Sequence, residues 1–211
     1  MNSKRPAAAH PPPRLVLATA NQHKLAELTR ILAAGQVAVD LVGLGGFPGA
    51  PDVRETGVTF AENALLKAHA IAEFTGLPAV ADDSGICVDA LNGMPGVLSA
   101  RWSGRHGDDQ GNLRLLLAQL ADVPEERRGA RFQCAAALVL PARREHVSEG
   151  AVHGRLIREA RGANGFGYDP IFVPDRAKLT TAEMTPAAKD KISHRGKALR
   201  ALAPVIAALL G

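Results

Sequence analysis

The chain has 211 residues, of which 46% are hydrophobic and 22% charged, a composition typical of a folded globular protein. No apolar run approaches the roughly 18 residues that a membrane-spanning helix needs, and the N-terminal segment lacks the apolar centre of a secretory signal. The formal charge is +4, but Lys4, Arg5 and Arg14 supply most of it, so the remainder is nearly neutral and nucleic acid is not an expected partner.

The first part of the chain predicts a tail followed by a strand and a helix. Residues 1–13 are rich in Ala and Pro and are expected to form a disordered tail, with one domain over residues 14–211. Residues 14–18 form a short apolar run, which predicts a buried strand. Residues 23–34 carry apolar residues at helical spacing, and Gly35 ends the predicted helix.

The turn between this strand and this helix is a candidate phosphate site. Thr19 and Asn21 precede the helix, whose free backbone N–H groups and dipole attract anions. Lys24 in the first turn opposes the dipole, which suggests an anion opposite it. The alternative is that Asn21 only caps the helix and Lys24 is solvated.

A second strand is predicted over residues 37–42, followed by a loop rich in glycine and proline. Thr59 and Glu62 form a capping box, which predicts a helix reaching about Phe74, before Gly76 and Pro78. The inward face of this helix is expected to hold four residues: Ala61, Leu65, Ala68 and Ala72. Lys67, taken alone, reads as a solvated residue in this helix.

The segment Ala81–Gly85 (ADDSG) follows a short apolar run at residues 77–80 and predicts a strand that ends in two carboxylates. Side chains alternate along an extended chain, so Asp82 and Asp83 are expected to face opposite ways and to have different roles. Adjacent acids there suit a hard cation, although Asp, Ser and Gly are also favoured where a strand simply turns.

The second half of the chain predicts a helix, a hairpin, a loop and a final helix. Asp108 and Asp109 are expected to cap the helix, and residues 131–140 and 145–152 to pair as the hairpin. Residues 162–170 form a glycine-dense loop with two aromatics, which suits either a base-stacking platform or an ordinary turn with Phe166 in the core. The last helix is predicted over residues 197–210.

The chain contains only two cysteines, Cys87 and Cys134, both in apolar, strand-like sequence. This placement favours buried thiols over a disulfide, and a pair is too few for a zinc site. With the missing secretory signal, the thiols predict a cytoplasmic protein.

Seven short motifs occur in an order that resembles the inosine triphosphate pyrophosphatase family, also called Ham1-like, over residues 14–210. The motifs are Thr19–Lys24, Glu55–Ala64 with Lys67, Ala81–Gly85, Gly93–Arg101, Asn164–Pro170, Thr181–Met184 and Ile192–Gly196. Each is weak alone, but the ordered set overrides the local alternatives.

The resemblance implies an α/β fold with a long mixed central sheet, flanked by helices, and two lobes with a cleft between them. It implies a homodimer, and hydrolysis of the purine nucleotides ITP, dITP and XTP to the monophosphate and pyrophosphate with Mg²⁺.

The resemblance also assigns site residues. Glu55 and Asp83 would bind Mg²⁺, with Asp83 also the general base, and Lys67 and Asp82 would support the reacting phosphate and water. The substrate-binding residues would be Thr19, Ala20, Asn21, Gln22, His23 and Lys24 for the phosphates, and Ser84, Phe166, Gly167, Tyr168, Asp169, Lys189, His194 and Arg195 for the nucleotide.

Two other functions remain open. A Maf-like pyrophosphatase would act on modified pyrimidine nucleotides, but its phosphate loop carries a Ser-Pro-Arg-type start that residues 18–21 (ATAN) lack. A non-catalytic nucleotide sensor would have no use for Glu55, Asp82, Asp83 and Lys67 together.

Overall fold

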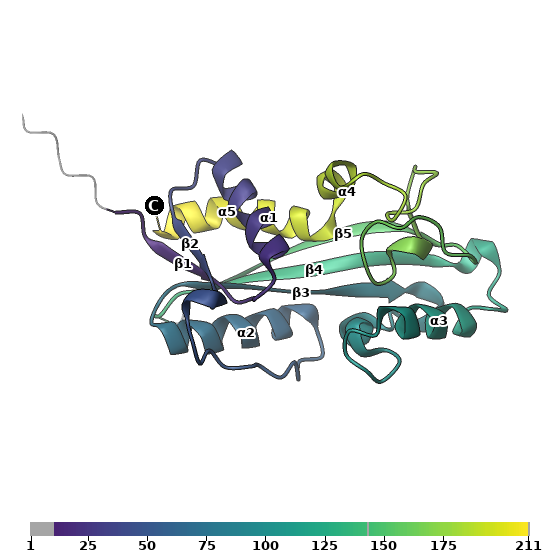
Figure 1. Ribbon diagram of the computed structural model, residues 1–211, viewed down its shortest axis with the longest axis horizontal. Coiled ribbons are helices and arrows are strands. Elements are labelled where there is room, and N and C mark those ends of the chain that lie inside the picture. Colours follow the sequence, from purple (N-terminus) through teal and green to yellow (C-terminus); the bar gives the residue numbers. More distant parts are fainter. Residues whose placement is uncertain (1–10, 143, 211) are drawn as a thin grey trace, which may run out of the picture.

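A curled six-stranded sheet runs along the longest axis of the computed structural model, which describes residues 11–142 and 144–210 (Figure 1). The strand order is β2-β1-β3-β4-β5-β6; β1 pairs in parallel with β2 and β3, and the other pairs are antiparallel. The strands are β1 (Arg14–Leu17), β2 (Asp40–Gly43), β3 (Ala79–Val88), β4 (Gly129–Val139), β5 (Glu145–Leu156) and β6 (Phe172–Pro174).

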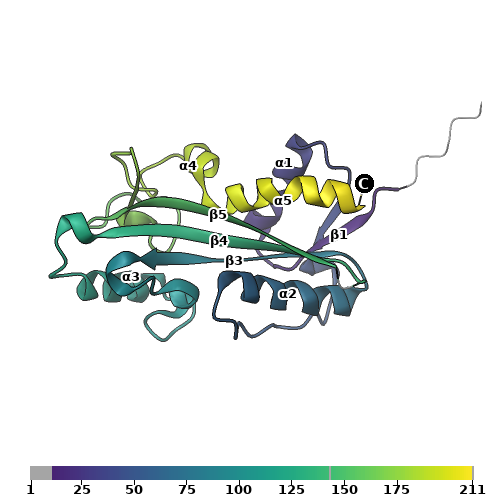
Figure 2. The same ribbon diagram turned by 180° about the vertical axis from the view of Figure 1, so that it is seen from behind.

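The helices cover both faces of the sheet. In Figures 1 and 2, α1, α4 and α5 lie on one face, and α2 and α3 lie side by side along the other. The α-helices are α1 (Gln22–Ala34), α2 (Phe60–Thr75), α3 (Asp109–Gln119), α4 (Pro186–Ile192) and α5 (His194–Leu210). Short 3₁₀ helices are η1 (Leu44–Gly46), η2 (Asp89–Leu91), η3 (Gly96–Arg101), η4 (Glu125–Arg127) and η5 (Asp169–Ile171).

At the β1 end of the sheet, successive side chains of a strand point to opposite faces, so the core there is divided into two clusters, one on each face. Leu15 and Leu17 pack toward α1 and α5, whereas Val16 between them packs toward α2. Strand β4 alternates in the same way, with Cys134 on the α5 side and Ala135 on the α2 side. Small alanines on both faces of β4 let helices approach closely, which compensates for the few aromatic residues.

A third apolar cluster lies at the opposite end of the long strands, beneath α3. It joins Ile86 and Val88 of β3 to Leu116 of α3 and Phe172 of β6. The long strands therefore run through both halves of the molecule, and each half has its own core.

Strand β3 differs from its prediction, because it does not end at the acidic pair. It continues through Asp82 and Asp83 to Val88, in unbroken register with β4 from Ala79↔Val139 to Val88↔Ala130. The partner strand lies about 50 residues away in the sequence, so local residue preferences could not reveal it. The expectation that Asp82 and Asp83 face opposite ways is confirmed by their contacts.

Gly85 does not form a turn. Because it has no side chain, the backbone of η3 can pack directly against β3 at this position. A Cβ there would lie 2.3 Å from Ser99 Oγ and 2.5 Å from the Gly96 carbonyl oxygen, both in η3. The Ser99 hydroxyl in turn accepts a hydrogen bond from the Ile86 amide at 2.9 Å. The glycine thus fixes η3 against β3.

Most predicted elements are present with shifted ends. Asn21 and Thr59 cap α1 and α2, Asp108 caps α3, and β4 and β5 form the predicted hairpin. Of the residues predicted inward on α2, Ala68 and Ala72 are buried, but Ala61 and Leu65 are only half-buried, because the stripe is centred on Ala64 and Ile71. Helix α4 and strand β6 were not predicted, since each is short and lies in polar or glycine-rich surroundings.

Both cysteines are free and buried, as predicted. The predicted N-terminal tail falls largely on residues 1–10, outside the described residues. Within the described part of the chain, none of the helices has the length and hydropathy required to cross a membrane.

Candidate active site

The candidate site lies where β1 ends beside β3. Strand β1 pairs with β3 only at Val16↔Ala79 and Leu17↔Val80, so β1 leaves the edge of β3 uncovered from Ala81 onward. Helix α1 leaves β1 on one face of the sheet, and α2 enters β3 on the other. Such a topological switch point is where open α/β sheets usually bind ligands.

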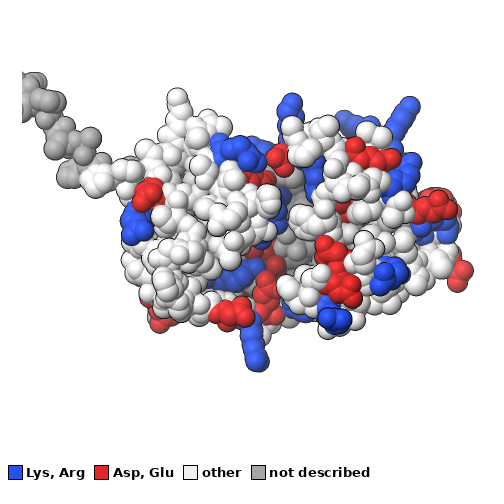
Figure 3. All heavy atoms as spheres, viewed as in Figure 1, with Lys and Arg blue, Asp and Glu red and all other residues white. Residues whose placement is uncertain are grey.

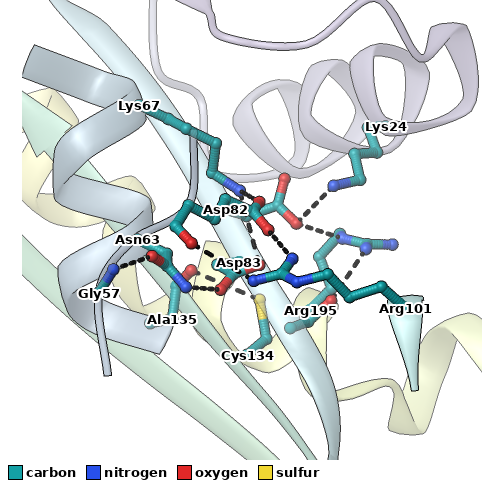
Figure 4. Close-up of polar contacts among 12 residues, drawn as sticks. Lys24, Gly57, Asn63, Lys67, Asp82, Asp83, Arg101, Cys134, Ala135 and Arg195 are labelled. Atoms are coloured by element: carbon teal, nitrogen blue, oxygen red, sulfur yellow. Dashed lines mark hydrogen bonds and ion pairs between the residues drawn. The ribbon is translucent and has the colours of Figure 1, made fainter. Parts of the chain in front are cut away.

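On the α1 and α5 face, Asp82 is enclosed by cations. Its Oδ2 atom lies 2.9 Å from Lys24 Nζ and 3.0 Å from Arg195 Nε, and its side chain is 4% exposed (Figure 4). Burial raises the pKa of Asp82, but the charges of Lys24 and Arg195 outweigh it and hold that pKa well below its usual range. Arg195 also donates to Ser84 Oγ at 3.4 Å. Asp82 is thus a fully paired anion, and it is the anion that the position of Lys24 suggested.

On the α2 face, Asp83 has a different environment. Lys67 Nζ lies 3.5 Å from Oδ1, and the Asn63 amide donates to Oδ2 at 3.1 Å. Burial raises the pKa of Asp83, Lys67 opposes the rise, and the charge of Glu55 adds to it, so the pKa is higher than usual. A buried carboxylate with a raised pKa binds a proton more readily than an ordinary aspartate, which is a property of general bases.

Glu55 reaches the same face from the loop before α2. Its carboxylate accepts from Lys67 Nζ at 2.7 Å and from Arg101 Nη1 at 3.2 Å. Burial raises the pKa of Glu55, but the bonds from Lys67 and Arg101 more than offset it, so the pKa is lowered. Burial alone would lower the pKa of Lys67. The negative charges of Asp83 and Glu55 outweigh burial, so the pKa is raised and Lys67 remains charged. Lys67, which the sequence predicted to be solvated, is therefore the centre of an acidic cluster formed with Glu55, Asp83, Asn63 and Arg101.

Two residues of the cluster, Asn63 and Arg101, carried no predicted role. Asn63 is completely buried; its side chain accepts from the Gly57 amide at 2.8 Å while donating to Asp83. A buried amide on the inward face of a helix was the available signal, because such a group requires partners. Arg101 ends the Gly93–Arg101 motif, but its partner Glu55 lies 46 residues away, so no contact of this side chain could be predicted from the sequence.

The turn at Thr19–Lys24 borders a cavity of about 510 Å³. Asn21 Oδ1 accepts from the amides of His23 and Lys24, so the predicted cap is present. Ala20, Gln22 and His23 are exposed around the turn, and Thr19 is half-buried. The cavity is lined by twelve residues: Ala18, Thr19, Ala20, Leu44, Pro51, Asp52, Val53, Glu55, Lys67, Ile71, Arg101 and His106. Figure 3 shows charged side chains of both signs gathered in the hollow between the two halves.

The glycine-dense loop offers one aromatic ring to solvent. Phe166 is 67% exposed, and Lys189 Nζ lies 5.2 Å from its ring centroid. Asp169 is buried; it pairs with Lys189 and accepts from the Phe166 amide at 2.9 Å. The Gly167 amide donates to Asp109 at 3.0 Å. The loop is thus held in a conformation that leaves the ring free to stack.

Tyr168 points away from this surface. Its ring is buried among the apolar residues under α3, and its hydroxyl donates to the Ser99 carbonyl at 2.9 Å. Of the residues predicted to bind substrate, Tyr168 therefore stands apart, because its side chain anchors the loop to η3.

His194 lies at the start of α5, stacked on Phe132 with ring centroids 5.1 Å apart. Burial lowers the pKa of His194, and the charges of Arg195 and Lys189 lower it further, to about 3. The imidazole is therefore neutral at physiological pH.

The acidic cluster fits a divalent cation that arrives with phosphate. Among the described residues, no three His, Cys, Asp or Glu side chains form a ready metal cage. Glu55 and Asp83 nevertheless share the Lys67 ammonium, so both carboxylates face one point. Mg²⁺ is commonly held by one or two carboxylates, with water and substrate phosphates completing its shell.

Comparison with known sequences gives close relatives across nearly the whole chain. The profile of the Ham1 family matches residues 15–205. The dITP/XTP pyrophosphatase of Streptomyces coelicolor is 63% identical over 198 residues, covering 94% of this chain and 99% of the relative. The protein of that name from Nocardia farcinica is 60% identical over 197 residues, with 93% and 96% covered.

Solved structures agree with this sequence similarity. The crystal structure of the nucleoside-triphosphatase, dITP/XTP pyrophosphatase, from Mycobacterium abscessus is 56% identical with a TM-score of 0.79, covering 92% of this chain and 99% of that one. A HAM1 protein from Coxiella burnetii is 41% identical with a TM-score of 0.86, covering 92% and 98%. The two-lobed α/β architecture is therefore common to these proteins.

Proposed function

This chain belongs to the Ham1 family, and from that premise we propose that it hydrolyses dITP, XTP and ITP to the monophosphate and pyrophosphate with Mg²⁺. It is a nucleoside triphosphate pyrophosphatase, as its relatives are named. The observation that carries the finer proposal is the contrast between Asp82, whose pKa is lowered, and Asp83, whose pKa is raised, on opposite faces of one strand.

Asp83 is the proposed general base. It accepts a proton from the water that attacks phosphorus; the water oxygen joins the phosphorus of the monophosphate, and the bond to pyrophosphate breaks. Asn63 holds Asp83 Oδ2, so Oδ1, on the Lys67 side, is the oxygen left to take the proton. Positioned proton transfer of this kind typically contributes about 10²–10⁴-fold in rate.

Glu55 and Asp83 are the proposed Mg²⁺ ligands, and the ion would offset phosphate charge and polarise the bound water when present. Lys67 then remains between the two carboxylates and the phosphates. Lys24 and the turn at Thr19–Lys24 are proposed to hold the phosphates next to the α1 N-terminus. Asp82 keeps Lys24 and Arg195 in place through its two ion pairs.

The proposed base choice depends on two donors, Lys189 beside the exposed ring of Phe166 and Arg195 beside Asp82 and Ser84. Hypoxanthine and xanthine carry a carbonyl at position 6, where adenine carries an amino group. Lys189 and Arg195 can only donate hydrogen bonds, so they suit the carbonyl. Guanine adds an amino group at position 2, and leaving such a donor buried without a partner costs about 1–3 kcal/mol. Stacking on Phe166 supplies affinity for any base.

The proposal also includes a homodimer acting in the cytoplasm, as the family resemblance implies. Deaminated purine nucleotides would be removed there before they enter nucleic acid.

The decisive experiment identifies the products of dITP hydrolysis by the wild-type enzyme in Mg²⁺. Orthophosphate should be detected only after inorganic pyrophosphatase is added. Without that coupling enzyme, heavy oxygen from labelled water should appear in the monophosphate and not in the pyrophosphate. The Asp83→Asn enzyme, purified in parallel, controls for contaminating phosphatases. Orthophosphate without the coupling enzyme would refute the proposed bond cleavage.

A further inference from the structure

Arg101, at the end of η3, reaches the acidic cluster from a different part of the chain than its other members. Nη1 lies 3.2 Å from Glu55 Oε2, and Nη2 lies 3.3 Å from the Glu55 carbonyl oxygen. The side chain is 30% exposed, so its far end borders the cavity and is not enclosed by protein. Figure 4 shows the guanidinium pointing toward the cluster that contains Asp83 and Lys67.

The four charged side chains of the cluster around Lys67 sum to zero formal charge. Glu55 and Asp83 supply two negative charges, and Lys67 and Arg101 supply two positive charges that contact them. A nucleoside triphosphate disturbs that balance, because its phosphates bring negative charge that competes with Glu55 for the Arg101 guanidinium. A guanidinium released from Glu55 then has the preferred anion within reach, because its planar fork matches phosphate geometry.

The position of Arg101 assigns it to one end of the nucleotide. Lys189 belongs to α4, on the face of the sheet shared with α1 and α5 (Figure 1), and its Nζ lies 5.2 Å from the centroid of the Phe166 ring. Lys67, which lines the cavity together with Arg101, contacts Asp83 on the other face. Thr19 and Ala20 border that cavity, so a phosphate chain starting at the base loop passes this turn before it reaches Arg101. A volume of about 510 Å³ accommodates a diphosphate with its water.

We propose that Arg101 binds the pyrophosphate end of the substrate, exchanging the Glu55 carboxylate for phosphate oxygens when the nucleotide enters. This inference rests on the proposed function and adds a residue that recognises the leaving group. It gives Arg101 two partners in succession, Glu55 in the free enzyme and pyrophosphate in the complex.

The backbone that carries Arg101 is firmly held, so only its side chain has to move. Ser99 is buried and bonds to the Ile86 amide of β3 and to the Gly96 carbonyl. Tyr168 donates to the Ser99 carbonyl, which ties η3 to the loop that carries Phe166. The fold therefore fixes the distance between the Phe166 ring and Arg101. A nucleotide that contacts both residues must have a length that matches this distance.

The test measures binding of inorganic pyrophosphate and of dIMP by calorimetry in EDTA, so that no metal or turnover is involved. Arg101→Ala should raise the Kd of pyrophosphate about 10- to 100-fold, as expected for a lost hydrogen bond between charged groups. The Kd of dIMP should not change. Arg101→Lys keeps the charge but lacks the planar guanidinium, so its Kd for pyrophosphate should lie between those of the wild type and Arg101→Ala. It replaces the Ala variant if that variant fails to fold.

Glu55→Gln separates direct binding from an effect transmitted through Glu55. If Arg101 binds pyrophosphate itself, removing the competing carboxylate should lower the Kd of pyrophosphate, and adding Arg101→Ala should abolish that gain. Arg105→Ala is the matched control, because Arg105 is an exposed arginine on the following segment and should leave both Kd values unchanged.

An unchanged pyrophosphate Kd in Arg101→Ala would overturn the proposal, as would Glu55→Gln weakening pyrophosphate binding as much as Arg101→Ala does. Failure of the proposed function is distinguishable, because it is read from the products of the wild-type enzyme. An enzyme that released orthophosphate from dITP would refute that function whatever the binding of pyrophosphate.

Discussion

Asp82 and Asp83 are neighbours in the sequence but belong to two different regions of the molecule. Asp82 lies on the face of β3 shared with α1 and α5, where Lys24 and Arg195 enclose it. Asp83 lies on the face shared with α2, where Asn63 and Lys67 contact it beside a second carboxylate. The pKa of the first is lowered and that of the second is raised. The difference teaches that one strand can carry two adjacent carboxylates whose pKa values are shifted in opposite directions by their surroundings.

The strongest test of this difference is Asp83→Asn, which keeps the shape of the side chain and removes its basicity. The kcat for dITP should fall by at least about 100-fold, because a positioned base contributes that much. The melting temperature should change little, since the charge of Asp83 is only partly compensated in the fold.

Asp89→Asn is the matched control and should retain full activity, because Asp89 is an exposed residue of η2, directly after β3. If Asp83→Asn kept more than about a tenth of the wild-type kcat, Asp83 could not be the general base.

The complementary change, Asp82→Asn, should act mainly on stability. Removing one partner from a buried ion pair costs about 3 kcal/mol or more, since Lys24 and Arg195 would be left facing each other without their shared anion. For a protein of this size that corresponds to a fall in Tm of roughly 6–12 °C.

Asp40→Asn removes a carboxylate from an exposed pair with Arg14 and should change Tm by little. Equal shifts in the two variants, measured by scanning calorimetry, would show that Asp82 is not a structural anion.

His194 makes the face of Asp82 sensitive to acid. Its pKa in the folded protein is about 3, below the unfolded value near 6.5, so the unfolded chain binds more protons between these values. The free energy of unfolding should therefore fall as the pH is lowered through this window, by about 3 kcal/mol between pH 6.5 and 4.

His194→Gln removes the titrating group, so its stability, measured by urea unfolding across the same range, should depend less on pH. An unchanged slope would mean that His194 titrates normally in the folded protein.

The smallest expected effect comes from Phe166→Ala, which removes only the exposed ring. Base stacking on an aromatic residue contributes at least about 1 kcal/mol, so KM should rise roughly fivefold for ITP and GTP alike. The kcat should be retained, because stacking on the ring is proposed to supply affinity and no part of the chemistry.

Phe74→Ala is the matched control. It removes a half-exposed phenylalanine near the C-terminal end of α2 and should leave KM unchanged. A change in the ratio of ITP to GTP turnover in Phe166→Ala would show instead that the ring takes part in base selection.

Local sequence was sufficient where the interactions are local. The caps at Asn21 and Thr59 bond within three residues of themselves, and the apolar spacing of α1 and α5 is repeated within each helix. The alternation that separates Asp82 from Asp83 is also local, because it follows from extended backbone alone. Together with the ordered motifs, these features gave the family, the architecture and most of the candidate site.

Contacts between distant segments were not accessible in this way. Strand β3 passes through its acidic pair because β4 pairs with all ten of its residues. Tyr168 lies in a motif that resembles a substrate-binding loop, yet it turns into the core because η3 offers its hydroxyl a carbonyl. Asn63 and Arg101 acquired roles only when α2 and η3 were packed against the site.

The sequence by itself determined the family and that the two carboxylates point apart, because both the order of the motifs and the alternation of side chains along a strand can be read from the chain. Tertiary structure alone decided which groups surround each carboxylate. Its partners come from α1, α2, η3 and α5, and the balance between burial and nearby charge, which sets a pKa, exists only once those elements are assembled.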